Sequence, residues 1–238
     1  MLKGTHEERE GALLKRIKNA GQTSKVGGFG FVTGADGGTK RRAMTVIARL
    51  DDAERVSDDI RRLVAAKVDG IEIAARGPQD VRALAEALGG ADIPYGVYIA
   101  ASDGVDAAAL AVIAGLDWVH ITTDAPARLL ADAEKGQGPT RLVSVSPDLP
   151  PGRLAGVAGL KTDLVVVDRA AARGPFTIDS LLALRTIQGA ARGSVLAGTG
   201  LGLLPDDIQV LHDNDIAGVL VSGGPATVEA FIEAIERL

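Results

Sequence analysis

Three residues that can transfer protons, Glu72, His120 and Asp168, lie in or directly after short apolar runs that share a pattern. The runs are VDGIEI (68–73), LDWVHI (116–121) and TDLVVV (162–167), and each opens on an apolar or hydroxyl residue followed by an aspartate. If the runs are β-strands, successive side chains point to opposite faces. Aligning the runs on that aspartate then places Glu72, His120 and Asp168 on the same face. Carboxylates and imidazoles are the usual groups of general acid–base catalysis.

The elements that must position these residues follow a regular alternation from Met44 onward. Eight short runs rich in β-branched residues predict strands at 44–49, 70–75, 95–100, 118–123, 141–146, 164–169, 194–199 and 218–223. Between and after them, helical periodicity predicts helices at 52–67, 78–89, 106–115, 125–135, 151–159, 177–190, 205–213 and 227–237. Strands that are joined by helices form a parallel sheet. Eight complete units favour a single α/β domain, a (β/α)8 (TIM) barrel, over an open sheet.

In such a barrel the face that carries Glu72, His120, Asp168 and Thr122 points to the axis. Burial is expected to raise the pKa of Glu72 toward neutrality, which suits a general acid or base. Asp168 is the second proton-transfer candidate, and His120 is expected to orient or polarise a substrate oxygen. A satisfied structural network of the same residues is the alternative. The three residues also suit a divalent metal chemically, but no local spacing motif supports a metal site and we predict none.

Further polar residues at strand ends are candidates for substrate contacts. Thr122, Ser144 and Ser146 are predicted hydrogen-bond partners, and Arg76 is predicted to meet a second anionic group, ahead of Arg49 and Arg169. No lysine falls near the carboxyl end of a predicted strand, which argues against Schiff-base chemistry. The order of residues along the chain suggests no serine–histidine–acid triad.

Two glycine-rich turns follow the seventh and eighth predicted strands. GSVLAGTGLGLLPDD (193–207) lacks the third glycine of a dinucleotide fingerprint, because Leu203 stands there. In a barrel, the loops after these two strands commonly bind phosphate. The helix after VSGGPAT (221–227) carries no acid until Glu229, so its positive end is free for an anion. The predicted phosphate-binding residues are Gly198, Thr199, Gly200, Ser222, Gly223 and Gly224. The alternative is that both are merely tight turns.

The segment VLAGTGLGLLPDDIQVLHDNDIAGVLVSGG (195–224) resembles the strand 7–strand 8 region of the phosphate-binding (β/α)8-barrel superfamily. That group includes thiamine phosphate synthase, the histidine- and tryptophan-pathway barrels and ribulose-phosphate epimerase, and the nearest pattern is the tryptophan synthase alpha subunit. VDGIEIAARGP (68–78) is similar to its second strand, whose glutamate transfers a proton, so the resemblance implies that role for Glu72. The chain lacks the family's Ser-Asp-Pro loop with a second catalytic aspartate, because residues 75–78 lead straight into a predicted helix. Only Glu72 and the phosphate loops therefore carry over.

Residues 1–43 precede the barrel pattern and are assigned as a separate N-terminal region, with the barrel at 44–238. The stretch 1–22 predicts a charged amphipathic helix. The glycine-rich and basic segment 23–43 is expected under the bottom of the barrel, or alternatively as an interaction segment through residues 40–42 (KRR).

Composition restricts the class of protein. The chain has 238 residues, 46% of them hydrophobic, and a net charge of −5 with dispersed basic residues, so neither nucleic-acid binding nor membrane-surface binding is expected. It has no cysteine, which excludes disulfides and thiolate catalysis. The N-terminus lacks the apolar stretch of a signal peptide, and we expect a cytoplasmic protein.

These features together predict an enzyme that acts on a small phosphorylated metabolite by lyase, isomerase or synthase chemistry, with no cofactor. An FMN-dependent oxidoreductase that uses the same phosphate site is one alternative, and a non-catalytic barrel that serves as a binding or assembly module is another. The sequence is compatible with a homo-oligomer, and it names neither the substrate nor the reaction.

Overall fold

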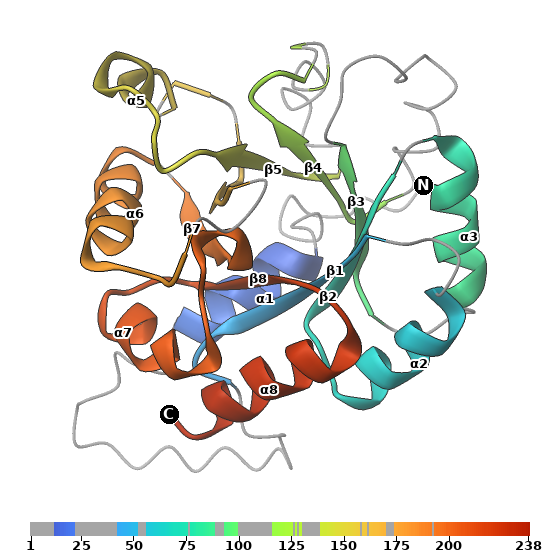
Figure 1. Ribbon diagram of the computed structural model, residues 1–238. Helices are drawn as coiled ribbons and strands as arrows, with labels where there is room; N and C mark the ends of the chain where they lie inside the picture. Colours follow the sequence, from blue (N-terminus) through green and yellow to red (C-terminus); the bar gives the residue numbers. More distant parts are fainter. Residues whose placement is uncertain are drawn as a thin grey trace, which may run out of the picture.

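Eight parallel strands close into a barrel in the computed structural model, in the order of the chain (Figure 1). The structure describes residues 12–21, 42–51, 56–75, 77–88, 93–99, 116–125, 127, 129, 139–157, 159–160, 162–169, 174–191 and 193–238. The strands are β1 (Thr45–Leu50), β2 (Gly70–Ala74), β3 (Tyr95–Ile99), β4 (Trp118–Thr122), β5 (Thr140–Val145), β6 (Leu164–Val167), β7 (Ser194–Gly198) and β8 (Gly218–Ser222). The predicted α/β barrel is thus confirmed, with strand ends shifted by no more than two residues.

Within the described residues the α-helices are α1 (Ala12–Gly21), α2 (Val56–Ala65), α3 (Pro78–Leu88), α5 (Pro151–Val157), α6 (Ile178–Ala190), α7 (Ile208–Asp213) and α8 (Pro225–Glu236). Two 3-10 turns, η5 (Thr199–Leu201) and η6 (Pro205–Asp207), follow β7. The helix predicted at 106–115 and most of the helix predicted at 125–135 lie outside the described residues. Helix α8 begins two residues earlier than predicted, because Pro225 has the fixed φ that suits a first helical position.

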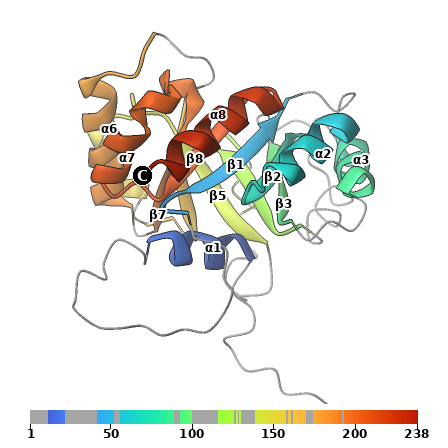
Figure 2. The ribbon, with the colours of Figure 1, turned by 90° about the horizontal axis from the view of Figure 1, so that it is seen from below.

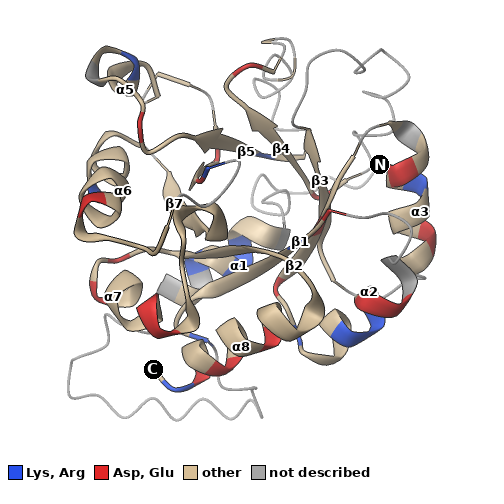
Figure 3. Cartoon of the chain, viewed as in Figure 1, with Lys and Arg blue, Asp and Glu red and all other residues tan. Residues whose placement is uncertain are grey.

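The strand side chains alternate between two cores. One set, such as Ile71, Val119 and Val165, is buried between the strands and the surrounding helices. The charged residues lie largely on the outer faces of helices such as α2, α3 and α8 (Figure 3). The opposite set of strand side chains fills the barrel interior, as a period of two residues requires.

Helix α1 closes the floor of the barrel, at the amino ends of the strands. Its buried Leu13 and Ile17 pack with the interior residues Ile47, Trp118, Leu142, Leu164, Val166, Leu196 and Leu220. Arg16 Nη1 donates to the Asp69 carbonyl at 3.1 Å, just before β2. Figure 2 shows α1 lying below the strands. The floor is therefore covered by the N-terminal helix; residues 23–41, which were expected there, lie outside the described residues.

Arg42 belongs to the basic run 40–42, the alternative interaction segment of the sequence analysis, and it bonds to other parts of this chain. Its guanidinium donates to the carbonyls of Lys67, at 2.5 Å, and Ala66, at 3.1 Å, at the carboxyl end of α2. It also reaches Glu236 Oε1 at 3.3 Å. Cations stabilise the last carbonyls of a helix, so Arg42 ties the chain before β1 to α2 and α8.

The aspartate shared by the three aligned runs makes the same pair of hydrogen bonds each time, and we call this the aspartate clamp (Asp69, Asp117 and Asp163). In each case Oδ2 accepts the backbone N–H of a residue on the preceding strand, and the N–H of the aspartate donates to the carbonyl of that same residue. The pairs are Asp69 with Val46 (2.9 and 2.9 Å), Asp117 with Tyr95 (3.0 and 3.1 Å) and Asp163 with Arg141 (2.8 and 3.1 Å). The repeat in the sequence therefore marks the floor ends of β1–β2, β3–β4 and β5–β6.

A fourth run, NDIAGVLV (214–221) at β8, resembles the three aligned runs but carries two extra residues, and it lacks the clamp. Ala217 donates its N–H to the Val195 carbonyl at 3.0 Å, as the clamp aspartates do to their partners, but it has no carboxylate to return the bond. The aspartate of this run, Asp215, stands two residues earlier with a φ of 57°. The two extra residues of this copy thus move its aspartate out of the register.

Replacing Asp117 with alanine is expected to lower the free energy of unfolding by about 1–3 kcal/mol, because the Tyr95 N–H loses its acceptor. Asp117→Asn keeps an acceptor oxygen and is expected to lose less. Urea unfolding of the two variants checks this. A loss below about 0.5 kcal/mol in Asp117→Ala would show that water replaces the carboxylate there.

Candidate functional site

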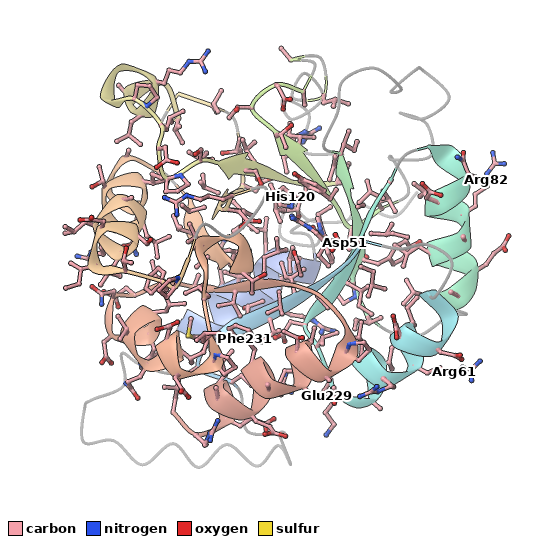
Figure 4. All side chains as sticks on the ribbon, viewed as in Figure 1. Asp51, Arg61, Arg82, His120, Glu229 and Phe231 are labelled. Atoms are coloured by element: carbon pink, nitrogen blue, oxygen red, sulfur yellow. The ribbon has the colours of Figure 1, made fainter. Side chains whose placement is uncertain are left out.

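Inward-facing polar side chains gather toward the carboxyl ends of the strands. They are Arg49 on β1, Glu72 on β2, Tyr98 on β3, His120 on β4 and Asp168 directly after β6. Figure 4 shows His120 inside the ring of strands, whereas Arg61 and Arg82 point away from the molecule. The structure thus brings together the three residues that the alternation placed on one face, Glu72, His120 and Asp168.

Glu72 is fully buried and accepts hydrogen bonds from two neighbours. Arg49 Nε donates to Oε1 at 2.7 Å, and Trp118 Nε1 donates to Oε2 at 3.1 Å. His120 Nδ1 lies 3.1 and 3.2 Å from the two oxygens. The Trp118 ring fits beside Glu72 because Gly96, on the strand between them, has no Cβ to overlap it.

These contacts overturn the expected protonation of Glu72. Burial alone would raise its pKa, but the charges of His120 and Arg49 and the hydrogen bonds outweigh it and lower the pKa from 4.5 to about 2. At neutral pH Glu72 is therefore a fixed carboxylate, and the prediction of a pKa raised toward neutrality is wrong. A neighbouring cation that the local sequence does not reveal is the reason.

That cation is Arg49, which the sequence ranked behind Arg76; Arg76 itself lies outside the described residues. Besides Glu72, the Arg49 guanidinium reaches His120 Nδ1 at 3.1 Å and Asp168 Oδ2 at 3.4 Å. Its central carbon lies 3.9 Å from the centroid of the Tyr98 ring, a cation–π contact. Burial would lower the pKa of Arg49, but Glu72 and Asp168 outweigh it and raise the pKa, so Arg49 stays charged.

Arg49 contacts each of the three residues considered as metal ligands. Among the described residues, no group of three His, Cys, Asp or Glu side chains is placed to hold a metal ion. The Arg49 guanidinium supplies a positive charge within this group.

Asp168 is the carboxylate with the opposite shift. Burial raises its pKa, and the opposing effects of Arg49 and of the Arg169 and Gly200 amides do not cancel the increase. Arg169 donates its N–H to Oδ1 at 2.9 Å. The side chain is 8% exposed, whereas that of Glu72 is 0% exposed, so Asp168 is the carboxylate nearer to the mouth.

Two glycines, Gly198 at the end of β7 and Gly200 directly after it, fit closely around Asp168. A Cβ on Gly198 would overlap the Asp168 carboxylate, and one on Gly200 would overlap the same carboxylate and the Arg169 carbonyl. Two amides of the predicted phosphate site already have partners, because Gly200 N–H bonds to Asp168 and Ser222 N–H donates to Thr199 Oγ1 at 3.0 Å. These glycines allow a close approach of the backbone to a carboxylate, which the sequence reasoning did not consider.

The other half of the predicted phosphate site is differently placed. Gly223 and Gly224 are exposed, and Gly223 has a φ of 130°, which an L-residue rarely adopts. Gly224 is the N-cap of α8, with no side-chain capping bond and no acid in the first turn of the helix. This turn has the features that suit an anion, and its binding of phosphate stays a prediction.

The predicted hydrogen-bonding side chains have distinct partners. Ser144 Oγ on β5 lies 2.7 Å from His120 Nε2. Thr122 Oγ1 donates to Asp124 Oδ1, and Ser146 Oγ accepts the Asp148 N–H at 3.2 Å. Barrel closure therefore builds a Ser144–His120–Glu72 chain that the residue order did not suggest, because the spacing between the strands and not a local motif sets these contacts.

Of the described helices, none is both long and apolar enough to cross a membrane. No protein-family model matches the sequence, and no curated protein matches it either.

The fold matches solved structures over most of the chain. The tryptophan synthase A-subunit of Pyrococcus furiosus superposes with a TM-score of 0.62 and 15% identity, covering 82% of this chain and 97% of that one. The phosphoribosyl anthranilate isomerase of Thermus thermophilus gives 0.60 and 14%, covering 82% and 99%. At this identity the likeness shows the fold alone. The resemblance to the tryptophan synthase alpha subunit is therefore confirmed as a shared (β/α)8 barrel.

Proposed function

We propose that this chain is an enzyme that acts on a small phosphorylated metabolite by lyase- or isomerase-type proton transfer. Asp168 is the proton-transfer group at the barrel mouth, and the Gly223–Gly224 turn with the N-terminus of α8 holds the phosphate. Glu72 positions Arg49 and His120 and does not itself exchange protons with the ligand.

The observation that carries the proposal is the contrast between the two carboxylates. Glu72 has a lowered pKa and is fully buried, whereas Asp168 has a raised pKa and is partly exposed beside Gly198 and Gly200 at the end of β7. A raised pKa moves a carboxylate toward the range in which general acids and bases work. The structural neighbours include an isomerase and a synthase subunit on the same fold, which supports the reaction class by analogy.

The phosphate site is best tested at Ala226, an exposed residue in the first turn of α8. Ala226→Asp places a carboxylate where the phosphate would bind and also complements the helix dipole, so the fold should keep its stability. A substitution at Gly223 would instead strain a backbone with a φ of 130°.

Thermal unfolding of the wild-type chain with inorganic phosphate, phosphorylated sugars and FMN is expected to show stabilisation by at least one of these ligands. The expected gain is about 2.7 kcal/mol at a ligand concentration 100 times Kd. Ala226→Asp should abolish the shift and Ala226→Ser should keep it. The same shift in all three proteins would place the phosphate elsewhere, and a shift with FMN alone would favour a flavin enzyme.

A further inference from the structure

The chain of contacts from Ser144 through His120 to Glu72 has the connectivity of a nucleophile, a base and an orienting acid. Ser144 Oγ meets His120 Nε2 at 2.7 Å, and the other ring nitrogen, Nδ1, lies 3.1 Å from Glu72 Oε1. Serine on Nε2 and carboxylate on Nδ1 is the arrangement that activates a hydroxyl in serine hydrolases of unrelated folds. The proton-transfer scheme proposed above leaves Ser144 without a role.

Burial falls along this array in the direction that such chemistry requires. Glu72 and His120 are both 0% exposed, whereas Ser144 is half-buried. Ser144 is the penultimate residue of β5 and pairs in register with Thr122, the last residue of β4. The hydroxyl therefore lies at the carboxyl ends of the strands, where barrel enzymes bind their substrates.

In its neutral form the ring of His120 has two arrangements, and the fixed charge of Glu72 favours the one in which Nδ1 carries the proton. A carboxylate only accepts hydrogen bonds and a guanidinium only donates them. If Nδ1 carries the proton it donates to Glu72, and Nε2 is free to accept the Ser144 proton. If Nδ1 is bare it accepts from Arg49 Nη2, at 3.1 Å, and Nε2 then carries the proton toward Ser144. Arg49 already donates through Nε to Glu72 and through Nη1 toward Asp168, so it has partners in either arrangement.

We propose that Ser144 is a nucleophile activated by His120 and oriented through Glu72, and that it accepts an acyl group from a small ester or thioester. The Oγ lone pair forms a bond to the carbonyl carbon while the hydroxyl proton passes to His120 Nε2 and the carbonyl electrons move to its oxygen. When these electrons return, the bond to the leaving group breaks and that group takes the proton from Nε2. A water molecule repeats both steps, releases the acid and restores Ser144.

This activity is separate from the proposed function, because it requires neither a phosphate nor Asp168. The two proposals can therefore fail independently.

The first experiment treats the full chain with a fluorophosphonate, which loses fluoride when a serine hydroxyl attacks phosphorus. Intact mass and peptide mapping are expected to find one adduct, on Ser144. The adduct should be lost in Ser144→Ala and kept in Ser146→Ala, whose hydroxyl accepts the Asp148 N–H. Because His120 acts as the general base, it is expected to accelerate the reaction of Ser144 with the fluorophosphonate by about 10²-fold or more.

A second experiment uses the absence of cysteine in the chain. Ser144→Cys introduces a single thiol beside His120, and Ser146→Cys introduces a matched thiol two residues away. A thiol next to a histidine is more readily ionised, so iodoacetamide at pH 6–7 is expected to alkylate Ser144→Cys at least about tenfold faster. Equal alkylation rates of Ser144→Cys and Ser146→Cys, together with no fluorophosphonate adduct on Ser144, would overturn the proposal. Circular dichroism of each variant verifies folding.

Discussion

Replacing Glu72 with glutamine is expected to lower the free energy of unfolding by about 3 kcal/mol at pH 7. The carboxylate faces Arg49 Nε at 2.7 Å and Trp118 Nε1 at 3.1 Å in a fully buried setting. A glutamine side chain keeps one acceptor oxygen but turns an amide N–H toward one of these donors. Removing one partner of a buried ion pair leaves the other charge uncompensated, which commonly costs about 3–5 kcal/mol.

The pH dependence of this loss follows from the lowered pKa. Because the pKa of Glu72 falls from 4.5 to about 2 on folding, its stabilisation is fully present above pH 4.5 and is lost as the pH falls toward 2. Urea unfolding of the wild-type and Glu72→Gln chains should therefore converge as the pH falls from 4.5 toward 2.

Glu229 provides the matched control. It pairs with Arg62 on the surface at 3.0 Å, and the side chains of Glu229 and Arg62 are 37% and 55% exposed. Exposed pairs contribute little, so Glu229→Gln is expected to change the free energy of unfolding by less than about 1 kcal/mol. Equal losses in the two variants, or a loss in Glu72→Gln that does not depend on pH, would contradict the fixed-carboxylate assignment of Glu72.

Replacing Asp168 with asparagine is expected to slow proton transfer by about 10²- to 10⁴-fold, the usual contribution of a general acid or base. The asparagine amide has the same shape as the carboxyl group beside Gly198 and Gly200, but it cannot take up or release a proton near neutral pH. Burial raises the pKa of Asp168, so the ionised form destabilises the fold above that pKa. The neutral asparagine should therefore not lower the free energy of unfolding at pH 7, which separates a loss of activity from a loss of structure.

Exchange of carbon-bound hydrogen in D2O, followed by NMR over a panel of phosphorylated sugars, measures this step without knowledge of the product. Asp148→Asn is the matched control, because its exposed carboxylate lies at the same end of the barrel and bonds to Arg169 at 3.2 Å. Exchange at the wild-type rate in Asp168→Asn would remove Asp168 from the proposed role.

The fold and the residues that face the barrel interior could be predicted from the sequence. Both follow from local patterns, namely the succession of strands and helices and the alternation of side chains along each strand. The aspartate before β2, β4 and β6 recurs for a structural reason, the clamp on the preceding strand, and it fixed the alignment that placed Glu72 and His120 in the interior. The same alternation applied to MTVIAR (44–49) would have placed Arg49 inside as well. That run has no aspartate before it, so Arg49 was assigned only to a possible anion contact.

The electrostatics of the site could not be predicted in the same way. Whether burial raises or lowers the pKa of a carboxylate depends on the charges within a few ångströms of it. For Glu72 these charges come from β1 and β4, which lie 23 and 48 residues away in the chain. The glycines after β7 were also ambiguous, because close approach to a ligand and close approach to Asp168 require the same missing Cβ.

The roles of the two carboxylates are tested most directly by a carbon-13 NMR titration of the side-chain carboxyl groups of Glu72 and Asp168 between pH 2 and 8. The signals are assigned with the Glu72→Gln and Asp168→Asn variants. The Glu72 signal is expected to stay at its ionised position down to about pH 3, because its pKa is about 2. The Asp168 signal should move at a pH above the ordinary 3.8 of an aspartate. A Glu72 signal that titrates near neutral pH, with Asp168 ionised throughout, would reverse the two roles and contradict the account.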